Sequence, residues 1–347
     1  MTDPNSSVAP VARVQHTHIG GQAVLEGVMM RGKYNWAIAV RKPDGDLHIE
    51  EHDLKTAVSR RPYLGKPVIR GIIGLYETIV LAMQAFGISA GFAGETEEEQ
   101  LSSKEIALTM VLGVGLAVLL FVVAPAVLTN FVVGQATDKP ITWNIVDGLM
   151  RVVFFFAYIW LVSRMRDIQR VFAYHGAEHK TIHAYEHGLD LEPELIQRYE
   201  TMHVRCGTSF LLMVMVIAIA VFSLVPVKTM AAGWGLDNRL SVLGLAIAVR
   251  IVLMPLIAGL AYEVIKWAGS RADQPVVKVI LWPGLMLQKM TTREPTDDMV
   301  EVAIAAVKPV IAREQREAGI IPAEEIAQAD DSPNDGPSLD AVLAETL

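Results

Sequence analysis

Four histidines recur at every fourth residue in the segment YHGAEHKTIHAYEH, namely His175, His179, His183 and His187. On an α-helix, residues four apart differ by only about 40° around the axis, so this spacing predicts one continuous histidine face. Neighbouring histidines on such a face can converge on one transition-metal ion. All four cannot share an ion, because His175 and His187 would lie about 18 Å apart along the helix axis.

The first pair of histidines encloses a glutamate in the pattern HGAEH, which matches the HxxEH motif of inverted zinc hydrolases. In that motif the two histidines bind the ion and the glutamate is the general base. A divalent ion lowers the pKa of its bound water towards about 7, so a neighbouring carboxylate can remove the proton. The pattern therefore predicts a metal site, with zinc as the favoured ion, in which His175 and His179 are ligands and Glu178 is the catalytic base.

A metal site on this helix also needs a ligand from another element. The segment HVRCGTS begins at His203 and lies just before the next apolar block, so a short turn would return it to the histidine face. We expect His203 to be the third ligand. Residues that could be further ligands, or could support the ligands, are Glu186, Cys206, Glu263 and His183.

The same residues allow two other interpretations. The segment can be a solvated polar helix whose histidines pair with Glu178, Glu186 and lipid headgroups. It can also be a pH sensor, since an unperturbed imidazole titrates at about pH 6.5. Metal analysis of the purified protein separates a metal site from a solvated face.

The elements that would position these residues are dominated by apolar blocks. Hydrophobic residues make up 52% of the 347 residues, and the mean hydropathy of +0.35 is high for a soluble domain. Each of four blocks is near the roughly 20 residues that cross about 30 Å of hydrocarbon, which predicts a mainly α-helical, polytopic membrane bundle of about four spans. The blocks are Ile106 to Val133, Ile141 to Val162, Ser209 to Val227 and Leu240 to Tyr262.

Basic residues flank these blocks asymmetrically, and such residues stay on the cytoplasmic side of a membrane. They precede the first block, follow the second and follow the fourth, whereas the other loops carry few charges. This pattern predicts a multi-pass protein of the cell inner (cytoplasmic) membrane, with both termini and the histidine-rich loop in the cytoplasm. The flanking residues are Arg60, Arg61, Lys66, Arg70, Lys104, Arg164, Arg166, Arg170, Lys266, Arg271 and Lys278.

A fifth apolar stretch runs from Ile72 to Phe92. A crossing there would invert the later spans and would place the basic sequence RMRDIQR outside. We therefore expect a re-entrant or interfacial helical hairpin that does not span, with glycines easing its bends, and the alternative is an ordinary span with an unusual topology.

Three charged residues fall inside the predicted spans. Asp147 and Arg151 are four residues apart, so they can pair on one helix. Arg250 must also face the bundle, and Asp147 is its candidate counter-ion. We expect this group to fix helix packing, because no pair of interrupted half-repeats indicates a transporter.

Two further elements have sequence signals. Strand-like runs flank the turn sequence KPDGD, which predicts a β-hairpin. Thr296 precedes DDMVEVAIAAVKPVIARE, and this segment has the N-cap and the acidic first turn of an amphipathic helix.

The expected organisation is a flexible N-terminus (1–15), a small cytoplasmic β element (16–67), a non-spanning helical hairpin (68–100), spans one and two (101–166), the cytoplasmic histidine-rich metal-site loop (167–208), spans three and four (209–265), a cytoplasmic C-terminal segment with a helix (266–318) and a disordered acidic tail (319–347).

Charge and cysteine content limit the classes of partner. The formal net charge of −8 owes much to acidic ends, and no basic stripe indicates nucleic-acid binding. The single cysteine, Cys206, excludes an intrachain disulfide. The expected partners are the lipid bilayer and a membrane protein or peptide.

Four separated motifs carry a resemblance to a known family. They are GGQAVLEGVMMRG, YHGAEHKTIHAYE, RCGTSF and TTREPTDDMVEVAI. With these motifs in this order, the chain resembles the bacterial YqhQ-like family of multi-pass membrane proteins over most of its length. The resemblance implies a protein of undetermined activity that is described as a predicted metal-dependent enzyme. The residues that it marks as candidates are His175, Glu178, His179, Glu186, His203 and Cys206.

Two hypotheses for the function remain open. The first is a metal-dependent hydrolase at the cytoplasmic face of the membrane, acting on a membrane peptide or a lipid-linked group. The second is a non-enzymatic membrane-protein assembly or scaffold factor with a structural metal or a histidine-rich cytoplasmic domain. Three ligands plus an open position would favour catalysis, whereas a closed tetrahedral set would favour a structural ion.

Overall fold

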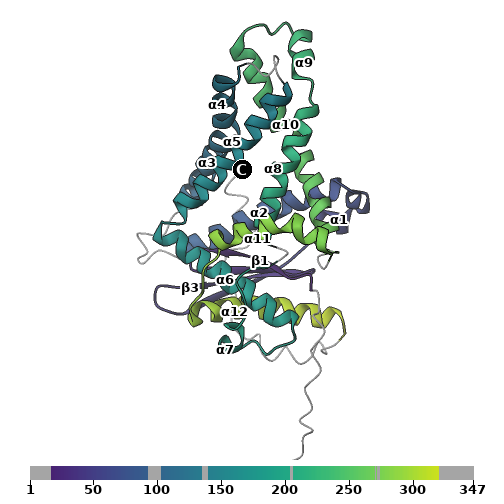
Figure 1. Ribbon diagram of the computed structural model, residues 1–347. Helices are drawn as coiled ribbons and strands as arrows, with labels where there is room; N and C mark the ends of the chain where they lie inside the picture. Colours follow the sequence, from purple (N-terminus) through teal and green to yellow (C-terminus); the bar gives the residue numbers. More distant parts are fainter. Residues whose placement is uncertain are drawn as a thin grey trace, which may run out of the picture.

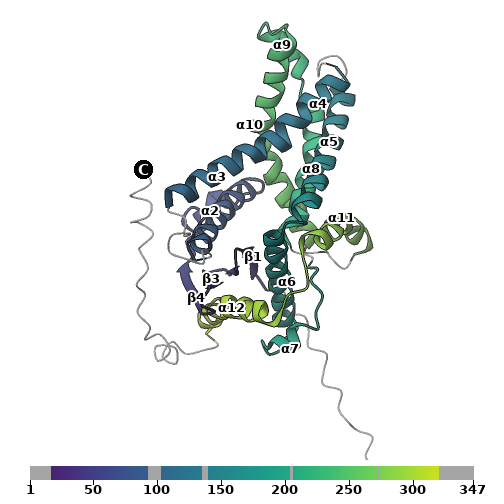
Figure 2. The same cartoon turned by 90° about the vertical axis from the view of Figure 1, so that its left-hand side faces the viewer.

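The computed structural model describes residues 17–92, 103–134, 140–203, 206–269, 271 and 274–319. The predicted flexible N-terminus and almost all of the predicted acidic tail lie outside these residues. Long helices form an elongated bundle at one end of the molecule (Figure 1). At the other end, a four-stranded sheet packs with the helices Arg166–Glu186 and Asp297–Glu317, and we call these elements the sheet layer (Figure 2).

The elements in chain order are β1 Gly20–Val24, β2 Gly27–Arg31, β3 Asn35–Arg41, β4 Leu47–Asp53, α1 Ala57–Arg60, η1 Pro62–Gly65, α2 Ile69–Phe92, α3 Ser103–Val118, the π-helical turn η2 Leu119–Val123, α4 Ala124–Val132, α5 Pro140–Val162, α6 Arg166–Glu186, α7 Pro193–Ile196, α8 Gly207–Leu224, α9 Val227–Gly233, α10 Arg239–Gly269, α11 Pro275–Thr291 and α12 Asp297–Glu317. The predicted amphipathic helix is confirmed as α12, which begins directly after its N-cap residue Thr296.

The sheet is antiparallel, and its strands lie in the order β1-β2-β3-β4. The predicted hairpin is confirmed, because β3 pairs with β4 across the KPDGD turn, with Ala39 opposite Ile49. Gly45 in this turn has a φ of 93°, a conformation that glycine adopts without the steric cost of a Cβ atom. A second hairpin joins β1 to β2, so the predicted β element contains four strands.

Both faces of the two central strands, β2 and β3, are buried. One face, which includes Val28 and Ala39, packs against apolar side chains of α6 and α12. The other face, which includes Trp36, packs against Leu81 of α2. Successive side chains of a strand point to opposite faces, so burial on both sides explains why β2 and β3 are apolar almost throughout.

Five helical segments are long and apolar enough to cross a membrane, and they indicate a membrane protein. Four of them coincide with the four predicted blocks. The first of these four passes through α3, η2 and α4, where Pro125 follows the π-helical turn. A proline lacks the N–H of a regular helical bond, which accounts for the irregular turn beside it. The five segments are Ile69–Phe92, Leu108–Val132, Ile141–Val162, Gly207–Leu224 and Arg239–Ala268.

The helical hairpin expected within 68–100 is wrong for the described residues, because α2 is one continuous helix of 24 residues. One of its glycines, Gly71, serves packing. A Cβ atom on Gly71 would lie 2.8 Å from the Cβ of Tyr262 and 2.9 Å from the carbonyl oxygen of Gly259, so Gly71 lets α2 approach α10 closely. This helix is also the fifth candidate span.

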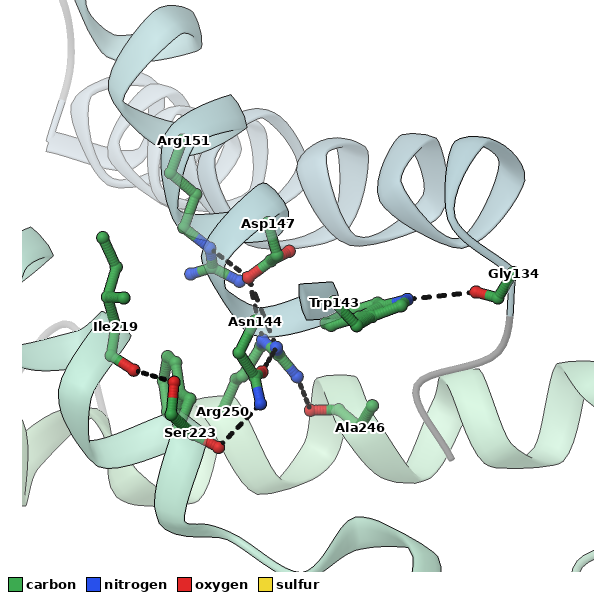
Figure 3. A network of polar contacts seen from close by, with 10 residues as sticks. Gly134, Trp143, Asn144, Asp147, Arg151, Ile219, Ser223, Ala246 and Arg250 are labelled. Carbon is green, nitrogen blue, oxygen red and sulfur yellow. Dashed lines mark hydrogen bonds and ion pairs between the residues drawn. The ribbon is translucent and has the colours of Figure 1, made fainter. Parts of the chain in front are cut away.

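The charged residues inside the bundle form one network around Asp147 (Figure 3). The predicted pair is confirmed, since Arg151 Nε donates to Asp147 Oδ2 over 3.0 Å. Arg250 from α10 donates to the same oxygen over 3.3 Å and to Asn144 Oδ1 over 2.8 Å. All four side chains are buried. One carboxylate therefore contacts two guanidinium groups and links α5 to α10.

Candidate metal centre

Helix α6 carries the histidine-rich segment. It packs between the sheet, α12 and the chain that follows α11. Tyr174 and Ala177 of α6 belong to the core shared with the sheet and α12. The backbone N–H of Arg293 donates to Phe172 O over 2.9 Å. A Cβ atom on Gly176 would lie only 2.0 Å from Arg293 O, so the chain crosses directly over this glycine.

His175, His179 and Cys206 bring three potential ligand atoms within 4.8 Å of one another, and we call them the first donor group. Cys206 Sγ lies 3.3 Å from His175 Nε2. A sulfur ligand at about 2.3 Å and a nitrogen ligand at about 2.0 Å from a tetrahedral zinc ion would be about 3.5 Å apart. The spacing of this group therefore fits a zinc-type ion.

Backbone carbonyls orient both histidines of the first donor group. His175 Nδ1 donates to Thr291 O over 2.8 Å, and His179 Nδ1 donates to Thr201 O over 2.5 Å. A carbonyl oxygen can only accept, so each neutral ring carries its proton on Nδ1 and keeps a lone pair on Nε2. Metal-binding histidines are usually held in this way by a partner of their other ring nitrogen.

His183, Glu186 and His203 form a second donor group, whose ligand atoms also lie within 4.8 Å of one another. His203 Nε2 and Glu186 Oε2 are 3.4 Å apart. Between ring centroids, His203 lies 4.6 Å from His183 and 5.7 Å from His179. The second donor group therefore adjoins the first along α6.

The loop before α8 decides which residues meet, because it runs antiparallel to α6. Tyr199 contacts the rings of His183 and His187 near the end of α6. Further along the loop, His203 reaches the second donor group and Cys206 reaches the first. The structure thus brings Cys206 to the position beside the HxxEH pair where the sequence predicts His203.

Glu178 lies outside both donor groups and faces strand β1. A Cβ atom on Gly21 would be 2.8 Å from Glu178 Cγ, and the backbone of Gly21 hydrogen bonds to the carboxylate. Burial raises the pKa of Glu178 to about 7, while the nearby His175 and the Gly21 hydrogen bond act in the opposite direction. This carboxyl group can therefore take up or release a proton near neutral pH.

Burial also favours the neutral forms of three donors. It lowers the pKa of His179 well below its usual value and lowers that of His203 to about 4. It raises the pKa of the Cys206 thiol. Neutral imidazoles offer lone pairs to a cation, and a bound cation would stabilise the thiolate.

Besides Glu178, two further residues of the sequence analysis lie outside both donor groups. Glu263 accepts hydrogen bonds from Arg70 Nε over 2.7 Å and from the backbone N–H of Val68 over 3.1 Å. It joins α2 to α10 and is not placed with the histidines. His187 Nδ1 donates to His183 O over 2.8 Å, within its own helix.

Residues that patterns in the sequence do not identify make contacts beside the donor groups, and one of them, Gln288, holds a member of the second donor group. The buried side chain of Gln288, in α11, accepts a hydrogen bond from His203 N over 2.8 Å and donates to His203 O over 2.9 Å. Lys180 Nζ donates to Gln197 O over 3.0 Å and pairs with Glu294. The Lys180–Glu294 contact joins the histidine-rich motif to the TTREP motif, and neither motif alone indicates it.

Substituting Gly176 by alanine should displace the chain at Arg293 and destabilise the protein by about 1–3 kcal/mol, as overpacking does in a close-packed region. The reason is that the new Cβ atom would meet a backbone carbonyl and not a flexible side chain. Thermal unfolding in detergent measures the effect. Gly74→Ala is the matched control, since nothing lies within 4 Å of a Cβ atom there. Equal stability of the two variants would contradict the close crossing.

Comparison with known proteins agrees with the four motifs. Residues 66–313 match a family described as protein of unknown function (DUF1385). The chain is 32% identical over 302 residues to the "Uncharacterized protein YqhQ" of Bacillus subtilis (strain 168), and the match covers 82% of this chain and 89% of that protein. No solved structure shows significant similarity to the chain. The resemblance is therefore confirmed, and the chain belongs to the YqhQ-like DUF1385 family of unknown function.

Proposed function

We propose that this membrane protein is a metal-dependent hydrolase, in which the first donor group holds the metal and Glu178 is the general base. The observation that carries the proposal is the convergence of three ligand atoms, from His175, His179 and Cys206, next to a buried carboxyl group. Both histidines already have the hydrogen-bond partners that metal ligands require.

The residues present fit a zinc ion. Two imidazoles and one thiolate are a ligand set that zinc uses in catalytic sites, where the fourth position stays open for water or substrate. Among the described residues, no other histidine, cysteine, aspartate or glutamate joins the first donor group. When bound, zinc would act as a Lewis acid and lower the pKa of water.

The role of Glu178 follows from its position and its environment. It precedes the ligand His179 directly and follows the ligand His175 by three residues, so it is close to the donors without being one of them. Its hydrogen bond with Gly21 holds the carboxyl group against β1. In the metal-free protein the pKa of Glu178 is about 7, so this carboxyl group can accept and release a proton near neutral pH.

We place the site at the cytoplasmic face of the inner membrane, with a membrane peptide or a lipid-linked group as substrate. In support, α6 lies at the end of the bundle where the sheet layer begins (Figure 1). A cavity of about 60 Å³ between α8, α10 and α11 has an apolar lining that includes Leu212, Met213 and Leu281. Ser209, three residues after the ligand Cys206, also lines this cavity, so an apolar group could approach from the bundle.

Burial of the site favours a second candidate, an assembly or scaffold factor with a structural ion. His179 is only 1% exposed and His203 is 4% exposed. The donor groups join α6 to the loop before α8, and Gln288 and Thr291 connect them to α11. An ion in this position would hold the sheet layer on the bundle without any reaction.

Metal analysis of the full-length protein, purified in detergent without chelators, tests the metal site. The wild type should contain stoichiometric zinc, and His179→Ala should lose the ion of the first donor group because it removes one of three ligands. His187→Ala is the matched control, since its ring bonds to its own helix and belongs to neither donor group. A metal-free wild type would refute the metal-dependent hydrolase.

A further inference from the structure

The second donor group has the properties of a metal site in its own right. Six donors distributed from His175 to Glu186 and along the adjoining loop cannot serve one ion, because these two residues are about 16 Å apart along the helix axis. Zinc in proteins takes about four ligands. The donors are divided into two sets of three, and each set converges separately.

We propose that His183, Glu186 and His203 bind a second divalent cation, so that α6 carries a two-metal centre. This inference rests on the proposed function, because it extends the same site by one ion. A histidine pair with one carboxylate is a ligand set that zinc, manganese and iron accept. The thiolate of the first donor group is the softer ligand, so the two positions differ in preference and the second binds zinc less tightly.

Hydrogen bonds to other parts of the chain support the residues of the second donor group. Thr17 donates through both its backbone N–H and its Oγ1 to Glu186 Oε1, each over 3.2 Å. The other oxygen, Oε2, is the one that faces His203 Nε2. His183 Nε2 donates to Met202 O over 2.8 Å, which fixes the orientation of the ring. Ligating carboxylates and histidines are commonly supported in this manner.

His203 is held in place from two sides of its backbone. Gln288 of α11 accepts from its N–H and donates to its carbonyl. The ring is buried between His183 and His179, at centroid distances of 4.6 and 5.7 Å. His203 therefore lies at the junction of the two donor groups, and the two ions would occupy neighbouring positions.

A pair of adjacent ions restricts the chemistry of the substrate. Two-metal sites are typical of phosphatases, nucleases and aminopeptidases, in which the ions stabilise both the attacking and the leaving group of a displacement. The substrate class that fits is therefore a phosphoester or a peptide bond carried by a membrane-linked molecule.

Cobalt titration of the metal-free, full-length protein in detergent tests the second ion. Two equivalents should bind, and the charge-transfer absorption of cobalt thiolate should saturate with the first, because only the first donor group contains a cysteine. Glu186→Gln should bind one equivalent and keep this absorption. Cys206→Ala should lose the absorption and bind one equivalent at the remaining group. Glu194→Gln, at an exposed position before the same loop, is the control and should bind two.

The outcomes separate the two proposals. One equivalent in the wild type, unchanged in Glu186→Gln, would overturn the second ion and leave the first site standing. No binding by the wild type would refute the hydrolase proposal as well. If Glu186→Gln does not fold, the titration of the wild type still tests the proposal. Cobalt binding that is complete when the thiolate absorption saturates would contradict a second ion.

Discussion

Replacing Asp147 by alanine should lower the free energy of unfolding by about 3–5 kcal/mol, which is the usual cost of removing one partner of a buried ion pair. Asp147 Oδ2 is the oxygen that both Arg151 and Arg250 contact. Without the carboxylate, two guanidinium groups would remain in an apolar bundle where an unpaired charge is expensive. Urea or thermal unfolding in detergent, followed by circular dichroism, measures the change.

A matched set of variants distinguishes the ion pair from a general effect of substitution. Asp237→Ala, in the exposed turn before α10, should change stability by less than about 0.5 kcal/mol. A triple variant with leucine at positions 147, 151 and 250 should be more stable than Asp147→Ala, because it removes all three charges together. Equal stability of Asp147→Ala and the wild type would show that the network does not hold α5 to α10.

The triple variant also tests the structural role of the network. Within the described residues, Asp147 Oδ1 and Arg151 Nη2 are buried without a hydrogen-bond partner. If the network serves packing alone, replacing its three charged side chains by apolar ones should increase the free energy of unfolding. None of these three residues belongs to a donor group, so the triple variant should keep the metal content of the wild type.

Replacing Glu178 by glutamine should stabilise the metal-free protein at alkaline pH. The free energy of unfolding of Glu178→Gln minus that of the wild type should be about 3 kcal/mol larger at about pH 8 than at about pH 4. This energy corresponds to the difference between the ordinary pKa of 4.5 and the raised value of about 7. Below about pH 4.5 the carboxyl group is protonated in both folded and unfolded chains. As the pH rises from about 4.5 to about 7, the unfolded chain ionises while the folded chain keeps its buried carboxyl group protonated, so stability is lost, and above about 7 both forms ionise and the loss levels off.

Unfolding of chelator-treated wild type and Glu178→Gln at several pH values measures this difference. Glu200→Gln, at an exposed position of the loop before α8, should follow the wild-type profile. Parallel profiles for wild type and Glu178→Gln would contradict a buried, neutral carboxyl group. In the hydrolase, Glu178→Gln should also retain the metal while the reaction rate falls by about 10² to 10⁴, the usual contribution of a general base.

The prediction for Glu178 connects stability to function. A buried carboxyl group that costs the fold several kcal/mol when ionised is more easily explained by chemistry than by packing. Retained metal with full biological activity in Glu178→Gln would favour the scaffold candidate, because a structural ion does not need a base.

The sequence by itself determined the features that depend on periodicity within one element. Apolar blocks of about 20 residues predicted four of the five candidate spans, and histidines at every fourth residue predicted the face of α6. The turn KPDGD predicted the β3–β4 hairpin, and the Asp147–Arg151 pair followed from a spacing of four on one helix. Each of these signals is local, because the backbone geometry of a helix or a turn relates neighbours along the chain.

Only the tertiary structure decided which elements meet. The loop before α8 runs antiparallel to α6, and this path brings Cys206 to His175 and takes His203 to Glu186. Gly71 allows α2 to pack on α10 as one continuous helix, whereas the sequence suggested that glycines would bend it. The crossing of Arg293 over Gly176 has no signal in either segment alone. Contacts between distant segments depend on shape and close packing, which periodicity does not encode.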